Sequence, residues 1–150
     1  MKFVHESFIN ASAERVFAFH LLPDAIDRLM PPWEHAVVIE RADISAPGSR
    51  AVIETRLFGM VTTRWIAEHR HFVPPHSFED IQISGPFRSW LHRHIVTPSG
   101  NGALLRDDIE FEPPLWVLGR LAAAFLITPR LEKLFRYRHE VTREWCENPE

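Results

Sequence analysis

The hydrophobic period of this chain changes near residue 35 and again near residue 113, and these two changes constrain the fold more than any other feature. Between His35 and Pro113 apolar and polar residues alternate with a period of two, which is typical of β-strands. Gly and Pro interrupt this stretch at 47–48, 59, 74–75, 85–86 and 98–102. The interruptions predict six strands in hairpin succession.

The N-terminal segment adds one strand and two short helices. Lys2–Ile9 alternates as a strand, and Ser12 is a good N-cap for a helix that ends before Pro23. A second short helix is expected over Asp24–Met30, because Pro31 and Pro32 follow it.

The C-terminal segment, from Pro114 to about Glu147, has the spacing of a long amphipathic helix that packs on the sheet. Pro129 lacks a backbone donor, so we expect a kink or a restart there, with Thr128 as N-cap. The residues expected on the apolar face are Leu118, Leu121, Phe125, Leu131, Leu134, Phe135, Val141 and Trp145. A solvated face is expected for Arg136, Arg138 and Arg143.

This order of elements predicts one α+β domain over residues 1–150, with a curved, seven-stranded antiparallel sheet around the long C-terminal helix. A chain of 150 residues is long enough to bury a core without disulfides or metals. We expect a cavity between the helix and the sheet, with the two short helices across its remaining opening.

Composition narrows the classes of partner. The net charge is −3 and the basic residues are scattered, which argues against nucleic-acid binding. A lone Cys146 and no signal-peptide pattern indicate a cytoplasmic protein. The longest apolar stretch, Leu115–Ile127, is too short to span a bilayer, so no stable membrane insertion is expected. No cofactor is indicated, and formation of a homo-oligomer stays open.

A row of polar residues falls on the face of the sheet that should be apolar. On the last strand Asp107 shares a face with Leu105, Ile109 and Phe111, where an unpartnered carboxylate would be costly. Trp90, His92 and His94 share a face of the preceding strand, and pairing of Val96 with Ala103 would set His92 opposite Asp107. One strand earlier, the residues that alternate on one face are Phe78, Asp80 and Gln82. A suitable turn at Gly85-Pro86 would place Asp80 beside His92. A strict two-residue loop would instead turn Ile81 and Ile83 inward.

Three interpretations of this polar row stay open. It is a structural hydrogen-bonded network that fixes the strand register, or a patch that orients a ligand in an apolar pocket, or a pair for general acid–base catalysis with His92 as base and Asp107 as its orienting partner. The catalytic interpretation has no accompanying nucleophile or oxyanion motif.

Two His-x-His pairs, His69/His71 and His92/His94, have the spacing of strand-borne metal ligands. In a meander the two pairs would lie two strands apart, roughly 9–10 Å, which is too far for both to close on one ion. The sequence therefore predicts no metal site.

The same residues resemble a known family. The run Phe78-x-Asp80-x-Gln82-x-x-Gly85-Pro86-Phe87-x-x-Trp90-x-His92-x-His94, with Leu105-x-Asp107 and Phe135-x-Tyr137-Arg138, is similar to a bacterial branch of the START/polyketide cyclase-like (SRPBCC) superfamily. The opening Phe8–Phe17 also resembles the start of that superfamily, although Ser12 replaces its usual Pro. The resemblance implies a helix-grip fold like that of the birch-pollen allergen, and binding of a hydrophobic molecule such as a lipid, sterol or polyketide.

The leading hypothesis is therefore a protein that binds or transports a small hydrophobic molecule in that cavity. The expected ligand-binding residues are Trp65, Asp80, Gln82, Trp90, His92, His94, Asp107 and Phe111. The alternative is an enzyme of cyclase or dehydratase type with His92 and Asp107 as acid/base pair. A third class is an interaction module whose cavity its own side chains fill.

Overall fold

The computed structural model describes residues 1–57, 61–113, 121 and 123–148 and contains one curved antiparallel sheet. The strand order is β1-β7-β6-β5-β4-β3-β2, so the first and last strands are neighbours. The strands are β1 (Lys2–Ile9), β2 (Ala36–Glu40), β3 (Arg50–Leu57), β4 (Val61–Val73), β5 (Ser77–Ser84), β6 (Ser89–Ser99) and β7 (Gly102–Glu112). The expected meander of seven strands is confirmed.

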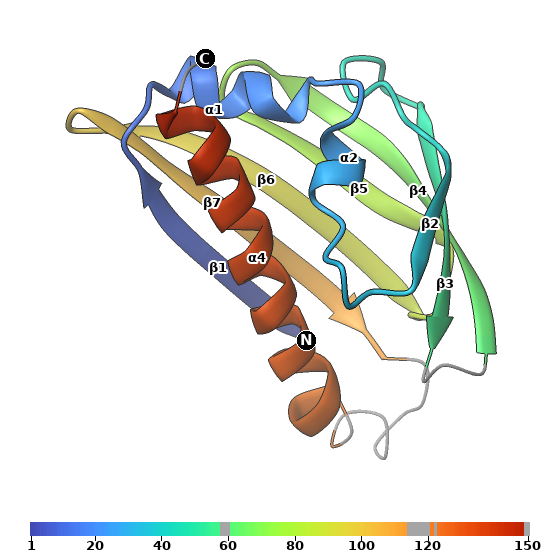
Figure 1. Cartoon of the computed structure of the whole chain (residues 1–150). Coiled ribbons are helices and arrows are strands. Elements are labelled where there is room, and N and C mark those ends of the chain that lie inside the picture. Colours follow the sequence, from blue (N-terminus) through green and yellow to red (C-terminus); the bar gives the residue numbers. More distant parts are fainter. Residues whose placement is uncertain (58–60, 114–120, 122, 149–150) are drawn as a thin grey trace.

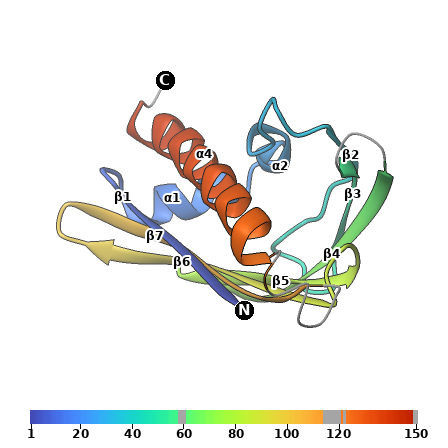
Figure 2. The same cartoon turned by 90° about the horizontal axis from the view of Figure 1, so that it is seen from below.

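All helices lie on the concave side of this sheet (Figures 1 and 2). They are α1 (Ala13–His20), α2 (Ala25–Arg28), the π-helical η1 (Ala123–Ile127) and α4 (Thr128–Glu147). The Oγ of Ser12 accepts a hydrogen bond from the amide of Arg15, which confirms Ser12 as the N-cap of α1. The α+β helix-grip architecture is thus as predicted, and α2 is shorter than the segment expected for it.

The C-terminal helix departs from its prediction near its start. The α-helix α4 begins at Thr128 but continues directly from η1, because Ile127 at the N-cap position is itself helical. Thr128 is therefore the first residue of α4 rather than its N-cap, and Pro129 lies in the first turn, where its missing N–H is harmless. Leu131 and Phe135 are buried as expected, whereas Leu121 and Phe125 are 60% and 77% exposed, so this part of the expected apolar face is wrong. Leu118 and most of the stretch 115–127 lie outside the described residues.

Two groups of buried side chains hold the helices on the sheet. One joins β1, α1 and β5–β7 to the end of α4, through Ile9, Phe17, Phe19, Phe78, Leu105 and Cys146. The other joins β1, β6 and β7 to the start of α4, through Phe3, Trp90, Ile109, Phe111, Leu131 and Phe135. Burial of one such large side chain contributes roughly 1.5–3 kcal/mol, so α4 is anchored at both ends.

The pairing of β6 with β7 differs by two residues from the prediction. Val96 pairs with Leu105 rather than Ala103, because the hairpin loop is only Gly100-Asn101 and the strands continue to Ser99 and Gly102. Gly100 has a φ of +56°, which a tight two-residue turn requires. A shift of two residues keeps every side chain on its predicted face.

In the part of the chain that the structure describes, no helix has the length and apolar character needed to cross a membrane.

Candidate functional site

A cluster of buried ionisable side chains lies on the concave face of the sheet, under α4. We call it the His–Asp cluster and define it as Asp80 on β5, His92 and His94 on β6, Asp107 on β7, and His139 on α4. Antiparallel pairing places Asp80 opposite His92 and His94 opposite Asp107. The prediction that Asp80 lies beside His92 on the inner face is therefore confirmed, and the alternative with Ile83 inward is wrong because Ile83 is 43% exposed.

Asp107 is the centre of the cluster, since three imidazoles contact its two carboxylate oxygens. The Nε2 of His92 donates a hydrogen bond of 2.7 Å to Oδ1. The Nδ1 of His94 lies 2.9 Å from the same oxygen, without hydrogen-bond geometry. From the other side, Nε2 of His139 donates a hydrogen bond of 2.6 Å to Oδ2. The register predicted His92 directly opposite Asp107; the two instead meet diagonally across the strand pair, because His94 occupies the opposite position.

Asp80 closes the cluster on the β5 side. One of its oxygens, Oδ2, lies 3.3 Å from Nδ1 of His92 and 3.5 Å from Nε2 of His94. Both imidazoles therefore lie between the same two carboxyl groups, Asp80 and Asp107. The ring of His94 is also stacked on Phe78, with ring centroids 4.1 Å apart, which fixes its orientation.

The pKa values in the cluster follow from these contacts. Burial alone lowers the pKa of His92, but hydrogen bonding to Asp107 and the closeness of Asp80 outweigh burial and raise this pKa to about 9. Burial raises the pKa of each carboxyl, but the neighbouring imidazoles hold the pKa of Asp80 and of Asp107 below its ordinary value. His92 thus holds its proton at neutral pH, which suits a hydrogen-bond donor or acid better than the predicted base.

Three further side chains, from Ser7, His5 and His20, lie around the cluster. Nδ1 of His139 hydrogen-bonds with Oγ of Ser7 at 2.9 Å, and the ring of His5 meets the ring of His139 edge to face. On α1, Nδ1 of His20 donates to the carbonyl of Val16 at 3.0 Å. Burial, with the neighbouring His94, lowers the pKa of His20 to about 3. The neutral His20 closes the α1 side of the cluster.

Sequence reasoning missed His139 and Ser7, although both follow visible patterns. His139 is four residues after Phe135 and therefore continues the buried stripe of α4. Ser7 lies between the inward-facing Phe3 and Ile9 of β1 with the same two-residue alternation. Each of them is a polar residue within an apolar stripe, and this pattern could have identified both as members of the site.

The predicted aromatic lining residues meet on the inner face beside the cluster. Trp65 on β4 contacts the ring of Trp90 edge to face, and Trp90 contacts Phe111. Trp90 and Phe111 are buried, whereas Trp65 is only half-buried. Trp65 is therefore the member of this aromatic group that remains accessible.

Gln82 has a structural role that the sequence did not reveal. Its side-chain amide donates to the carbonyl of Phe87 at 2.7 Å, and its Oε1 accepts from the amide of Phe87 at 3.3 Å. A Cβ on Gly85 would lie 2.4 Å from this Oε1, so glycine leaves room for the contact. Gln82 thus organises the loop between β5 and β6.

Arg138 does not lie on a solvated helix face as predicted. Its Nε donates to the carbonyl of Leu29 at 3.2 Å, and its side chain lies over the ring of Phe135. Burial lowers the pKa of Arg138, opposed by the charges of Asp107 and Asp80. The guanidinium therefore joins α4 to the segment after α2 and faces the acidic side of the cluster.

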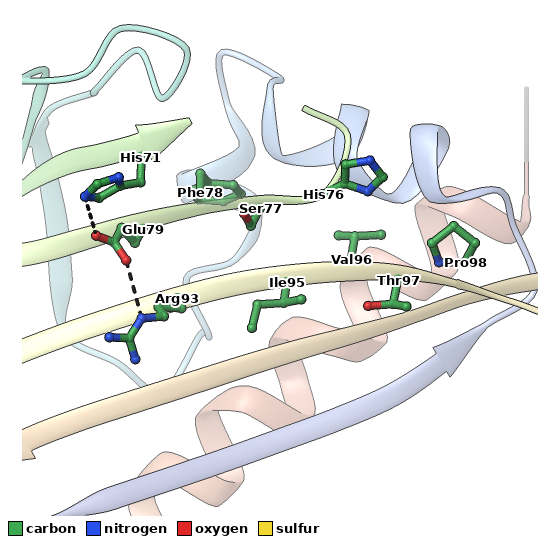
Figure 3. A pocket seen from close by; sticks show the side chains of 10 residues that line it. All are labelled: His71, His76, Ser77, Phe78, Glu79, Arg93, Ile95, Val96, Thr97 and Pro98. Carbon is green, nitrogen blue, oxygen red and sulfur yellow. Dashed lines mark ion pairs between the residues drawn. The ribbon is translucent and has the colours of Figure 1, made fainter. Parts of the chain in front are cut away.

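The two His-x-His pairs differ in orientation. His92 and His94 both face inward, but His71 faces outward because the β4–β5 register shifts between Arg70 and Val73, and its φ is +47°. His71 lies at a groove of about 310 Å³ on the face of the sheet away from the helices (Figure 3). In this groove Nε2 of His71 lies 3.4 Å from Glu79, which in turn lies 3.4 Å from Nε of Arg93. None of the predicted site residues lines this outer groove.

Three members of the cluster have the residue types and the spacing to hold a metal ion. One ligand atom from each of Asp80, His92 and His94 lies within 4.8 Å of the other two. Within the described ranges, this is the one such group of three or more residues.

Comparison with known proteins identifies a family. The family model described as "Polyketide cyclase / dehydrase and lipid transport" matches residues 9–134. No functionally curated protein matches the chain.

Several solved structures share the fold at low sequence identity. Protein CV1439 from Chromobacterium violaceum has a TM-score of 0.75 at 15% identity, covering 99% of this chain and 98% of that one. A START superfamily protein from Mycobacterium smegmatis has a TM-score of 0.70 at 15% identity, covering 97% of both chains. The di-domain aromatase/cyclase StfQ from the steffimycin biosynthetic pathway has a TM-score of 0.74 at 16% identity, covering 97% of this chain and 50% of that one.

A helix-grip sheet, a C-terminal helix over its concave face and a family match over most of the chain lead to one conclusion. This chain belongs to the polyketide cyclase/dehydrase and lipid-transport family.

Proposed function

We propose that the chain binds a small, mainly apolar molecule on the concave face of the sheet, next to the His–Asp cluster. The observation that carries this proposal is a row of half-buried apolar side chains on the inner face of β2, β3 and β4. Val38 pairs with Ile53, and Ile53 pairs with Trp65. All three are half-buried, whereas most side chains on the inner face of β6 and β7 are buried. We call Val38, Ile53 and Trp65 the apolar wall.

The apolar wall continues directly into the polar cluster. Trp65 contacts Trp90, which precedes His92 by two residues on β6, and Asp80 and His94 are the cluster members nearest to solvent, at 12% and 13% side-chain exposure. A molecule on the wall would place one polar group near Asp80 and His94. His92 and Asp107, at 5% exposure, would hold these two residues in place from behind.

The energetics of such a site divide between its two parts. Burial of apolar ligand area contributes roughly 25 cal/mol per Å², so the wall supplies most of the affinity. Polar groups in an apolar pocket fix orientation, because a ligand without a matching polar atom would take water from Asp80 and His94 and return no hydrogen bond. The selectivity therefore comes from the cluster.

The test uses adjacent residues on opposite faces of β2. Val38 lies in the wall, while Val37 faces away from it and is 62% exposed. We expect a fluorescent fatty acid to bind the wild-type chain, V38N to weaken binding by about tenfold, and V37N to leave it unchanged, as expected for loss of one apolar contact. Native mass spectrometry after gentle purification would show a bound molecule. No bound molecule and no binding of the probe, or an equal effect of both variants, would contradict the proposal.

The alternative is an enzyme of cyclase or dehydratase type that uses His92 and Asp107. Their hydrogen bond of 2.7 Å is the arrangement of a histidine held by a carboxylate for proton transfer. In that case His92→Asn abolishes turnover of a polyketide-like substrate while binding stays nearly unchanged. Loss of binding and turnover together favours the binding protein instead.

A further inference from the structure

Three side chains of the His–Asp cluster bring one possible ligand atom each within 4.8 Å of the other two. His92 and His94 alternate along β6, and Asp80 faces them from β5. Oδ2 of Asp80 lies 3.3 Å from Nδ1 of His92 and 3.5 Å from Nε2 of His94. These separations match ligand atoms on a tetrahedral ion, which are about 3.3 Å apart when each bond is 2.0–2.1 Å long.

The contacts to Asp80 do not have the character of ordinary hydrogen bonds. The hydrogen bonds that His92 and His139 donate to Asp107 are 2.7 and 2.6 Å long. Both imidazole contacts with Asp80 are longer and lack hydrogen-bond geometry. Two imidazole nitrogens thus converge on one carboxylate oxygen at the distance of co-ligands.

The other nitrogen of each imidazole faces a second carboxylate. Nε2 of His92 and Nδ1 of His94 lie 2.7 and 2.9 Å from Oδ1 of Asp107. Histidines that bind a metal almost always present their second nitrogen to a carboxylate or carbonyl, which fixes the tautomer and the ring orientation. Asp107 is itself held by His139 on α4. His92 therefore already has the support that metal-binding histidines require, and the second nitrogen of His94 lies close to the same carboxylate oxygen without a hydrogen bond to it.

The balance of charge and hydrogen bonds also favours a cation. Two carboxylates, Asp80 and Asp107, are buried to 9% and 3% exposure on an otherwise apolar face. Among the described residues, buried Nδ1 atoms of His69 and His94 have no hydrogen-bond partner. His69 is the residue paired with Asp80 on β4, so an imidazole nitrogen without a partner lies on the β4 side of this carboxyl group.

We propose that Asp80, His92 and His94 form a binding site for one divalent transition-metal ion, with Zn²⁺ or Fe²⁺ as the best match. Two imidazoles and one carboxylate are a donor set that both ions accept, and three protein ligands leave a further position open. Binding through Nδ1 of His92 displaces the extra proton that this imidazole carries at neutral pH. The sequence analysis excluded one metal ion that is bound by both His-x-His pairs together, because the pairs lie too far apart. The proposed site uses one of these pairs and a carboxylate from the neighbouring strand.

The first experiment measures metal binding to the chain without any organic ligand. Untagged protein is treated with EDTA, dialysed, and titrated with Zn²⁺ by calorimetry and with Co²⁺ by visible absorption. We expect one ion per chain and the intense absorption of a tetrahedral or five-coordinate Co²⁺ site. Absence of binding overturns the proposal, and so does Co²⁺ that keeps the weak spectrum of the hydrated ion.

The second experiment assigns the ligands with matched variants. We expect D80N and H94Q each to weaken Zn²⁺ binding by at least about tenfold. The control H71N/H76Q removes the two exposed histidines of the outer groove and should bind like wild type (Figure 3). If D80N and H94Q both still bind Zn²⁺, or if H71N/H76Q loses binding, the ion binds at the surface and the proposal is overturned.

A measurement on the wild-type chain covers the case in which an inner variant fails to fold. Zinc-edge X-ray absorption should show two imidazoles among nitrogen and oxygen donors at 2.0–2.1 Å. A shell of water oxygens alone, or more than two imidazoles, overturns the assignment to these three residues. These experiments contain no fatty acid, so failure to bind a metal does not contradict the proposed binding of an apolar molecule. Likewise, failure to bind a fatty acid does not contradict the proposed metal site.

Discussion

Nε2 of His139 on the C-terminal helix lies 2.6 Å from Oδ2 of Asp107 in the last strand. Both side chains are buried, at 2% and 3% exposure, so this hydrogen bond crosses the interior between the helix and the sheet. In a helix-grip fold this is the space where apolar packing is expected. The bond therefore links the position of α4 to the ionisation of the cluster beneath it.

Replacement of Asp107 by Asn should strongly destabilise the fold. The substitution keeps the shape of the side chain but removes the charge that three imidazoles share. Breaking a buried ion pair at one partner costs about 3–5 kcal/mol, because the other partner stays buried and uncompensated. Urea unfolding at pH 7 measures the free energy of unfolding.

The control for Asp107 is Glu110, which lies on the same strand and pairs with Arg93 at 2.7 Å. Glu110 is 52% exposed, so E110Q should cost no more than about 1 kcal/mol. Equal losses in D107N and E110Q would show that the buried position of the cluster contributes nothing to stability.

Replacement of His139 by Leu should loosen α4 more than it destabilises the sheet. The change removes the hydrogen bonds to Asp107 and Ser7, and leaves Asp107 with its remaining partners on β6. The expected loss is about 1–3 kcal/mol. Hydrogen exchange followed by mass spectrometry should show faster exchange in 128–148 and little change in β6.

The neighbouring residue supplies the control for His139. Glu140 is exposed and, among the residues that the structure describes, forms an ion pair with Arg143 on the same helix. E140Q should leave the exchange of α4 unchanged. Protection of 128–148 that is equal in H139L and wild type would mean that apolar packing alone positions the helix.

Alternation along the strands was enough to predict which residues share the inner face. Asp80, His92, His94 and Asp107 come together as expected because the side-chain period of a strand is two, and an error of two residues in the hairpin register does not change the face. His92 is the partner of Asp107 and lies beside Asp80, as predicted. Only the directly opposite pairs of β6 and β7 were wrong, because alternation does not detect a shift of two residues. The length of the loop before Gly102 cannot be decided from a stretch that is rich in turn residues.

Contacts between the helices and the sheet could not be predicted in this way. The helical spacing predicts which residues of α4 are buried, but it does not predict which strand each of them contacts. Without these contacts, His139 was missed and Arg138 was assigned to solvent. His71 shows the other limit, because a local register shift turned one residue of a regular alternation outward. Such shifts depend on the pairing of two strands, and the sequence of one strand does not reveal them.

Protonation of His20 should make the fold less stable as the pH falls below 6.5. Burial holds the pKa of folded His20 at about 3, and the ordinary value is 6.5. The unfolded chain therefore binds one more proton than the folded chain between these values, so stability is complete above pH 6.5 and decreases toward pH 3. The groups that face His20 are His94, Asp107, His139 and the carbonyl of Val16, and of these Asp107 and the carbonyl favour the proton.

The measurement compares wild type with H20Q by urea unfolding in EDTA between pH 4.5 and 6. Wild type should lose about 1.4 kcal/mol more per pH unit than H20Q, the value for one proton. The control H76Q changes an exposed histidine and should follow wild type. Parallel curves for wild type and H20Q would mean that His20 gains its proton equally in both states.

The thiol of Cys146 should be nearly unreactive in the folded chain. Burial raises its pKa from 9.0 to about 11, so at pH 8 the folded chain holds about 100 times less thiolate than the unfolded chain. The side chain is also 2% exposed and lies under α1, where its Sγ is 3.8 Å from the carbonyl of Arg15. Reaction with a disulfide reagent should therefore be at least about 100 times slower in buffer than in urea. A native rate close to the rate in urea would show that the end of α4 opens readily from α1, and would contradict the anchoring of this helix at both ends.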